Sequence, residues 1–179
     1  MAVSLLWRYL FMKDGLVNQA LAVLGVPAIA WLSSPSIALF TVSLLSVWQF
    51  GSSMVIFLAG LKQIPAELYE AARIDGASPW RAFLAVTLPL LSPIILFNLV
   101  MQLVGAFTEF TGVFVITAGG PVKSTYLYVM KLYDEGFQFF NMGYASALSW
   151  VLFALIVILT ATIFRSSGAW VHYSDGGKS

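Results

Sequence analysis

Long apolar runs separated by short polar segments dominate this chain. Three of these runs carry no charged residue, and they cover residues 37–61, 91–107 and 143–164. As a helix, the first run would be about 37 Å long, which exceeds the roughly 30 Å hydrocarbon core of a bilayer. Residues 1–12 form a shorter apolar run, which we expect to be part of a further spanning helix. The pattern predicts an all-α membrane protein with three complete spans.

Residues 65–88 lie between the first two long runs and have a different pattern, which predicts two short helices. The first covers residues 66–74, with Pro65 at the first helical position, where a missing N–H costs nothing. Gly76 can adopt a positive φ and so ends this helix in a tight turn. Ser78 is then a suitable N-cap for the second helix. We call residues 65–88 the elbow.

The segment from Thr111 to Asn141 is too polar and too rich in glycine to be another span. A turn is expected at Gly119-Gly120-Pro121, because glycine and proline together favour turns. A short amphipathic helix is expected from Ser124 to Tyr133. This segment therefore connects the second and third complete spans on one side of the membrane.

The order of residues in and after the elbow resembles the EAA loop of ATP-binding-cassette importer permeases. The resemblance is carried by Glu70-Ala71-Ala72, Asp75-Gly76-Ala77, Leu88-Pro89 and Pro93. Flanking sequences resemble the carbohydrate-uptake branch of that family, and they include Phe57-Leu58-Ala59-Gly60-Leu61, Gly119-Gly120-Pro121 and Gly143-Tyr144-Ala145. The resemblance covers nearly the whole chain. It implies the C-terminal part of a type I importer permease fold, which carries a sugar or sugar-like solute across the cytoplasmic membrane.

The resemblance also implies a set of partners. These are a dimer of ATPase subunits, a second permease subunit, an extracytoplasmic solute-binding protein and the surrounding lipid. The elbow would dock on the ATPase through Glu70, Ala71, Ala72, Asp75, Gly76 and Ala77. The alternative is an elbow that only connects two spans. Relative to the family, the chain is expected to be truncated at its N-terminus and to begin inside the third spanning helix.

Composition agrees with a membrane location. Apolar residues make up 60% of the chain and charged residues 9%, whereas soluble domains have about 25% charged residues. A soluble domain of this length would leave large apolar patches exposed. The net charge of +1 provides no electrostatic footprint for nucleic acid. The absence of cysteine excludes disulfides and thiolate metal sites.

The distribution of basic residues gives the expected orientation. With the elbow in the cytoplasm, five basic residues lie inside: Lys62, Arg73, Arg81, Arg165 and Lys178. Lys13, Lys123 and Lys131 then lie outside, with Arg8 near the outer end of the partial span. This small excess follows the positive-inside rule. The C-terminus is accordingly expected in the cytoplasm, in a multi-pass protein of the inner membrane.

A polar stripe is expected on the second complete span. Asn98, Gln102, Gly105 and Glu109 are spaced by 4, 3 and 4 residues, which places them on one helical face. Such a stripe must face protein or water, because unpaired polar groups are costly in hydrocarbon. Asn98, Gln102, Glu109 and Trp150 are the candidates for the solute path. The alternative is hydrogen bonding between helices, and Glu109 can equally be a solvated interfacial carboxylate.

Other function classes have weaker support. An intramembrane enzyme would use Glu109 or the pair Asp134 and Glu135 as acid or base, but it leaves the elbow unexplained. The third possibility is a truncated permease fragment without transport activity. His172 and Asp175 are too few ligands for a metal site. We therefore expect no cofactor, no metal and no covalent chemistry in this chain, with ATP hydrolysis assigned to the partner ATPase.

Overall fold

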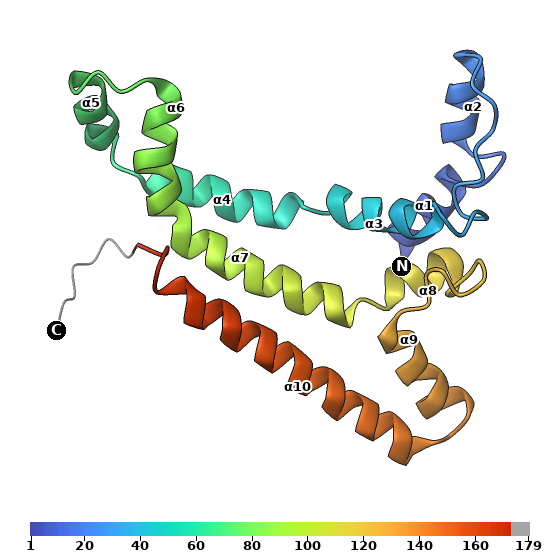
Figure 1. Ribbon diagram of the computed structural model, residues 1–179. Coiled ribbons are helices and arrows are strands. Elements are labelled where there is room, and N and C mark those ends of the chain that lie inside the picture. The colour runs from blue at the N-terminus through green and yellow to red at the C-terminus, as the bar shows by residue number, and fades with distance from the viewer. Residues whose placement is uncertain (173–179) are drawn as a thin grey trace. The chain divides into compact units, whose positions relative to one another are not determined.

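The computed structural model describes residues 1–172, and the regular elements in that range are all helical (Figure 1). Asp175 and Lys178 lie outside the described residues. The α-helices are α1 (Ala2–Leu10), α2 (Leu16–Val23), α3 (Ala38–Trp48), α4 (Gly51–Gln63), α5 (Ala66–Ile74), α6 (Pro79–Ala82), α7 (Leu88–Thr108), α8 (Thr111–Thr117), α9 (Tyr128–Tyr133) and α10 (Met142–Ser167). Two π-helical turns, η1 (Phe83–Thr87) and η2 (Asp134–Gln138), follow α6 and α9.

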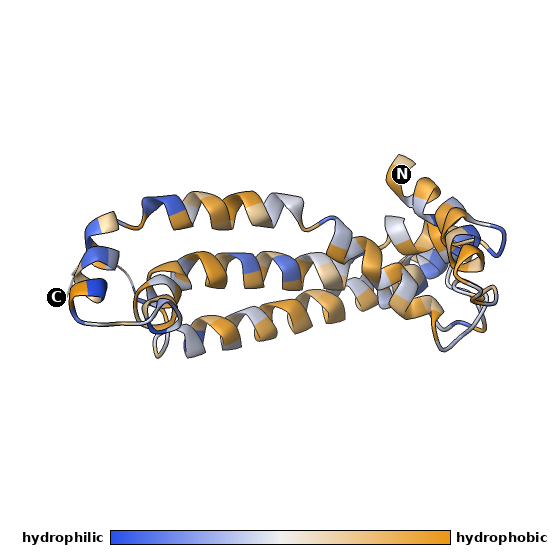
Figure 2. Cartoon of the chain, turned by 90° about the horizontal axis from the view of Figure 1, so that it is seen from above, coloured by the Kyte–Doolittle hydropathy of each residue, from blue (hydrophilic) through white to orange (hydrophobic). Residues whose placement is uncertain are grey.

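The chain forms two compact units, which are described separately. The first unit comprises Met1–Phe50 and Gly105–Phe153. The second comprises Gly51–Val104 and, among the described residues, 154–172. Figure 2 shows long helices dominated by hydrophobic residues, while hydrophilic residues gather on α5. This distribution is that of helices that face an apolar medium and are joined by polar connections.

The first unit has its core where α1 and α3 meet α8. Its buried side chains are Trp7, Val42, Leu45, Val113, Ile116 and Met130. The indole Nε1 of Trp7 donates a hydrogen bond of 3.0 Å to the carbonyl oxygen of Thr41. Thr41 is itself fully buried, and its hydroxyl donates to the carbonyl of Trp31 at 3.2 Å. Burial of polar groups is tolerated here because each has a partner.

Asn18 holds together the connection between α1 and α3. It is buried, and its Nδ2 donates to the carbonyls of Lys13 and Ile29, both at 2.9 Å. Its Oδ1 accepts from the indole N–H of Trp31 at 3.0 Å. Trp31 also makes an edge-to-face contact with Phe11. A single amide side chain therefore fixes a long loop, and Trp31 is a packing residue of that loop.

In the second unit, α4 and α7 approach each other closely at a glycine. A Cβ atom added at Gly60 would lie 2.0 Å from Cδ1 of Ile94 and 3.0 Å from Cδ2 of Leu91. Small residues permit such close helix contacts within membranes. Figure 1 shows α4 and α7 side by side along this contact. The hydrogen bond from Nε2 of Gln102 to Oγ of Ser53, at 3.1 Å, joins the same two helices.

The expected spans correspond to helices whose bounds differ from the apolar runs. The run 37–61 forms α3 and α4, which meet at a bend of 41° between Trp48 and Gly51. The run 91–107 lies within a continuous helix, Pro79–Thr108, of 30 residues. The run 143–164 lies within α10, Met142–Ser167. By length and composition, two helices can cross a membrane, or three if the bent pair counts as one span.

The continuous helix contains a change of hydrogen-bond register just before a proline. Across η1 the amide of Leu88 donates to the carbonyl of Phe83, five residues earlier. Pro89 follows directly and has no N–H to donate. Such π-turns accommodate an interruption of the α-helical ladder without ending the helix. The second helix of the elbow therefore runs into the following span as one continuous helix.

The segment between α7 and α10 has a shorter helix than expected. The turn at Gly119-Gly120-Pro121 is present, with a cis peptide bond between Gly120 and Pro121. The predicted helix from Ser124 to Tyr133 begins only at Tyr128. Thr125 explains the late start, because its buried hydroxyl contacts the Gly120 carbonyl and the Thr117 hydroxyl, both at 2.7 Å. These contacts keep Thr125 in the turn.

Candidate functional site

The first helix of the elbow, α5, covers the predicted residues Ala66–Ile74. Pro65 is its N-cap residue, so the prediction that it occupies the first helical position was wrong by one residue. Asp75 caps the C-terminus, and Gly76 follows with φ of +74°. The predicted positive φ of this glycine is confirmed. Gly76 N–H donates to the Arg73 carbonyl at 3.0 Å, which satisfies one of the last carbonyls of the helix.

The second helix of the elbow starts as predicted at Ser78. The Ser78 hydroxyl accepts a hydrogen bond from the amide of Arg81 at 3.4 Å, and Pro79 occupies the first helical turn. The elbow is closed by a hydrogen bond of 2.9 Å between the hydroxyls of Tyr69 and Thr87. Because Thr87 is buried in η1, this bond ties α5 to the base of the long helix. The elbow is therefore an ordered unit of two helices.

The candidate coupling residues lie on an accessible part of the elbow. Glu70, Ala71, Asp75 and Gly76 are exposed, and Ala72 and Ala77 are partly buried. Sequence reasoning did not select Ile74 and Trp80, whose exposed fractions are 87% and 70%. Exposed apolar side chains of this size among charged neighbours are typical of a protein-binding surface. Both are large apolar residues that flank the predicted turn at Gly76, and this position could have identified them from the sequence as exposed.

Asn98 and Gln102 have partners on helices of the second unit. Asn98 is buried, and its Nδ2 donates to the carbonyl of Ile94 in its own helix at 3.1 Å. Gln102 is exposed and donates to Ser53 of α4. The hydrogen bond between Gln102 and Ser53 is the interhelical contact that the alternative interpretation requires. It leaves the remaining amide oxygen of Gln102 available to a solute.

Glu109 is not part of the helical stripe that was expected to include it. Helix α7 ends at Thr108, so the stripe stops one residue earlier. The Oε1 atom of Glu109 accepts a hydrogen bond of 2.7 Å from the amide of Gly112 at the start of α8. Trp150 lies on α10, 70% exposed, in edge-to-face contact with Phe153. Glu109 and Trp150 thus belong to the first unit, and Asn98 and Gln102 to the second.

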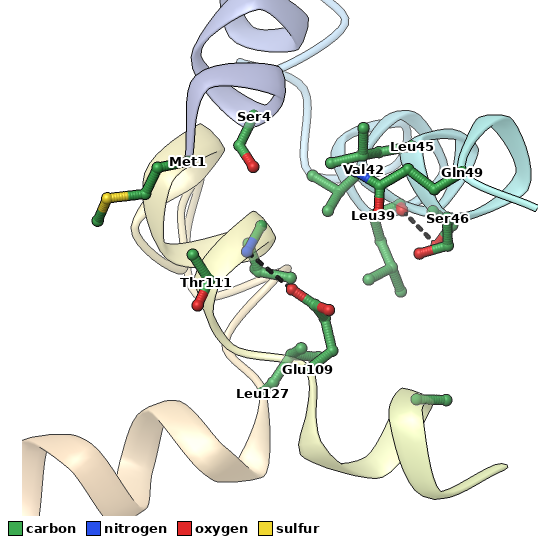
Figure 3. Close-up of a pocket in the computed structure, with 14 residues that line it drawn as sticks. Met1, Ser4, Leu39, Val42, Leu45, Ser46, Gln49, Glu109, Thr111 and Leu127 are labelled. Carbon is green, nitrogen blue, oxygen red and sulfur yellow. Dashed lines mark hydrogen bonds between the residues drawn. The ribbon is translucent and has the colours of Figure 1, made fainter. Parts of the chain in front are cut away.

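A pocket of about 350 Å³ lies in the first unit beside Glu109 (Figure 3). Ser4 of α1, Ser46 of α3, Gln49 at the C-cap of α3 and Thr111 of α8 line it together with Glu109. Figure 3 shows these polar side chains around the same space, interspersed with Leu39, Val42 and Leu45. The volume is within the range of small-molecule sites, about 300–1,000 Å³. Sequence spacing did not reveal this site, because its residues come from three separate segments.

The acidic pair considered for catalysis is engaged in local hydrogen bonds. The Tyr126 hydroxyl donates to Oδ2 of Asp134 at 2.5 Å, and Nδ2 of Asn141 donates to Oε2 of Glu135 at 3.0 Å. Burial, followed by the hydrogen bond to Asp134, raises the pKa of Tyr126 to about 12. Among residues 1–172, no group of three or more metal-ligating side chains is close enough to hold an ion. These carboxylates therefore act as acceptors that order the segment before α10.

Comparisons with known proteins agree on one family. Residues 1–172 match the family described as the binding-protein-dependent transport system inner membrane component. The probable ABC transporter permease protein YesP of Bacillus subtilis (strain 168) is 48% identical over 177 residues, which cover 97% of this chain and 57% of that protein. The sulfoquinovosyl glycerol transport system permease protein SmoG of Agrobacterium fabrum is 40% identical, over 84% of this chain and 49% of that protein.

Solved structures show the same fold. A bacterial ABC transporter involved in the import of the acidic polysaccharide alginate contains a chain with a TM-score of 0.84 and 22% identity, covering 94% of this chain and 60% of that one. The present chain spans about half the length of the curated relatives it matches. The all-α permease fold and the resemblance found in the elbow are thereby confirmed. The chain belongs to the family of inner membrane components of binding-protein-dependent transport systems.

Proposed function

We propose that this chain is part of a permease subunit of an ATP-driven importer for a sugar or sugar-like solute. The observation that carries the proposal is the elbow, which presents exposed carboxylates and apolar side chains on two ordered helices. Family membership and the names of the relatives support the same function. In this function a separate ATPase subunit hydrolyses ATP, and this chain forms part of the solute path.

The elbow would transmit movement of the ATPase to the membrane. Its second helix is continuous with α7, so a displacement of α6 is passed along a single helix of 30 residues. Glu70 and Asp75 would accept charge-assisted hydrogen bonds from basic groups of the ATPase. Ile74 and Trp80 would fill apolar depressions of its surface. A second permease subunit and an extracytoplasmic solute-binding protein would complete the assembly, with the C-terminus of this chain in the cytoplasm.

Cross-linking from single cysteines tests this proposal, because the chain has no native cysteine. Ala71→Cys places a thiol on the exposed face of α5, and Ala28→Cys places one in the exposed loop between α2 and α3. Both variants are expressed together with the ATPase subunit of the transporter and treated with a thiol-to-amine cross-linker. The ATPase subunit should be captured by Ala71→Cys and not by Ala28→Cys. Equal capture by both, or capture by neither, contradicts the proposed function.

A further inference from the structure

We propose that the segment after α10 holds the base of the long helix stiff, with Ser92 as the positioning residue. We call Ser92 together with residues 169–172 the clamp. The inference rests on the proposed function, because stiffness matters for a helix that transmits movement of an ATPase. It goes beyond that function, because it gives a role in coupling to a segment outside the elbow. Three features support it: a weakened stretch of the helix, a hydroxyl that bridges two segments, and an ordered chain after α10.

Two prolines interrupt the hydrogen-bond ladder at the base of the long helix. Pro89 has no N–H to donate to the carbonyl of Ala85, and Pro93 has none to donate to the carbonyl of Pro89. Just before them, η1 shifts the register, so that the amide of Leu88 donates to the carbonyl of Phe83. Helices kink at prolines and at π-turns, because the regular ladder is broken there. The long helix would therefore bend most easily in this stretch.

Ser92 replaces one of the missing hydrogen bonds. Its side chain is only 3% exposed, and its Oγ donates to the carbonyl of Pro89 at 2.5 Å. This is the carbonyl that Pro93 leaves without its usual helical donor. A carbonyl without a donor is costly where water is excluded, so the hydroxyl stabilises the interrupted turn. Ser92 thus supplies a donor at the point where the backbone lacks one.

The same hydroxyl also binds the chain that follows α10. The backbone amide of His172 donates to Oγ of Ser92 at 2.8 Å, although the two residues are 80 positions apart in the sequence. A hydroxyl can donate one hydrogen bond and accept others, so Ser92 makes both bonds at once. Figure 1 shows the end of α10 returning to the base of α7. Ser92 therefore connects the weakened turn of one long helix to the segment that leaves another.

The segment after α10 is ordered by its own backbone. The amides of Trp170 and Val171 both donate to the carbonyl of Ser167, at 3.1 and 2.8 Å. Trp170 and Val171 are partly buried, whereas His172 is exposed. His172 contacts Ser92 through its backbone amide and not through its imidazole. A substitution at position 172 therefore breaks this bond only if it removes the N–H, as proline does.

A distance measured along the helix tests whether the clamp keeps it straight. The chain has no cysteine, so nitroxide labels can be attached at Leu84→Cys and Met101→Cys, two exposed positions on either side of both prolines. Pulsed electron paramagnetic resonance records their distance in the assembled complex in nanodiscs, without nucleotide and after trapping with ATP and vanadate. With the clamp intact, the distance distribution should be narrow and equal in both states. Ser92→Ala and His172→Pro should each increase the fraction of bent helices in the trapped state by about twofold to tenfold, as expected for the loss of one hydrogen bond.

Two control variants match these changes. His172→Ala keeps the backbone N–H and alters only the side chain. Ser167→Ala removes another buried hydroxyl, which donates at 2.7 Å to the carbonyl of Phe164 within α10 itself. Neither control should change the distance distribution. The proposal is overturned if Ser92→Ala or His172→Pro leaves the distribution unchanged, or if the controls broaden it to the same extent.

Hydrogen–deuterium exchange separates failure of the clamp from failure of the proposed function, because it requires neither nucleotide nor ATPase. Exchange at the His172 amide should be about twofold to tenfold faster in Ser92→Ala than in Ser167→Ala. Faster exchange without capture of the ATPase by Ala71→Cys would support the contact of Ser92 with His172 and contradict the proposed function. Unchanged exchange together with normal capture would overturn the clamp alone.

Discussion

The amide of Ala77 donates a hydrogen bond of 2.9 Å to the carbonyl of Ala72, across the end of α5. Together with the bond from Gly76 to Arg73, it forms the paired arrangement of a Schellman motif. Both alanines belong to the six candidate coupling residues, so the short side chains of that set have a structural reason. They lie on either side of a turn that is held by backbone hydrogen bonds rather than by side chains. Gly76 at the centre of this turn requires a positive φ.

Replacement of Gly76 by valine should weaken association with the ATPase subunit while leaving membrane insertion intact. At φ of +74°, a residue with a Cβ atom raises the free energy of the folded state by about 1–2 kcal/mol, and β-branching makes that conformation less favourable still. The elbow would relieve this strain by changing shape. Co-purification of the ATPase with the variant permease is the measurement.

Gly25→Val is the matched control for this prediction. Gly25 also has φ of +74°, also follows the C-cap of a helix, and also has open space around the position of a Cβ atom. The same strain is thus introduced outside the elbow. If both variants lose the ATPase to the same extent, the effect is a general loss of folding and the prediction for Gly76 is wrong.

Single cysteines should show that the elbow and the α8–α9 connection lie on opposite sides of the membrane. Ser78 is exposed in the elbow and suits labelling from the cytoplasm. Ser124 was the natural choice for the other side, but its hydroxyl is buried without a partner, so a thiol there would react slowly. Val122 is 88% exposed and replaces it.

A membrane-impermeant maleimide added to intact cells should label Val122→Cys and should label Ser78→Cys only after the membrane is permeabilised. Labelling of both positions from the same side would contradict the three-span arrangement of the chain.

Gln102 and Ser53 should be energetically coupled if they hold α4 and α7 together. Gln102→Leu and Ser53→Ala each remove one partner of the 3.1 Å hydrogen bond. In a double-mutant cycle on the thermal stability of the complex, the coupling free energy should be about 0.5–1.5 kcal/mol. Uptake per assembled complex is measured in parallel. A coupling energy near zero, with reduced uptake per complex for Gln102→Leu alone, would instead assign Gln102 to the solute path.

The stability of the segment before α10 should decline between about pH 10 and pH 12. Folding raises the pKa of Tyr126 from 10.0 to about 12, so the folded state favours the protonated hydroxyl. This contribution to the free energy of unfolding is complete below pH 10 and is lost as the pH rises through the folded pKa. The charged groups that act on it are Lys123, 5.4 Å above the Tyr126 ring, Asp134 and Glu135.

The Tyr126→Phe variant should remove this part of the pH dependence, because it has no hydroxyl to ionise. Thermal unfolding of both proteins at several values between pH 9 and pH 12 is the comparison. Parallel curves for the two proteins would show that Tyr126 does not titrate in this way.

The parts of the fold that could be predicted from sequence are those set by local chemistry. Residues 66–74 became α5 and Gly76 took a positive φ, because proline, glycine and an N-cap serine act within a few residues. The break after Trp48 was not predicted, because the run 37–61 was identified by its lack of charge, and the polar and glycine residues at Gln49 and Gly51 do not by themselves end a spanning helix. Glu109 continues the polar spacing of the stripe but lies just beyond the end of α7 at Thr108, and it accepts a hydrogen bond from the amide of Gly112 in α8 instead.

The candidate functional residues also differ in how well they could be predicted from the sequence. The elbow is one contiguous segment, so its residues could be found from their order. The pocket is formed by Ser4, Ser46 and Glu109, which are far apart in the sequence and meet only through the packing of α1, α3 and α8. Periodicity within one helix cannot reveal such a combination. The two amides chosen by periodicity, Asn98 and Gln102, instead hydrogen-bond within the second unit.

The bend between α3 and α4 has a consequence for the dielectric environment along the span. Helix ends leave amide and carbonyl groups outside the regular ladder, and lipid tails offer them neither donors nor acceptors. If the bent pair is one span, a break between Trp48 and Gly51 therefore calls for water or polar protein groups at that depth. The residues on both sides of it, Gln49 among them, then experience a more polarisable medium than their apolar neighbours. Solvent-sensitive fluorophores attached there would report that hydration as a red-shifted emission.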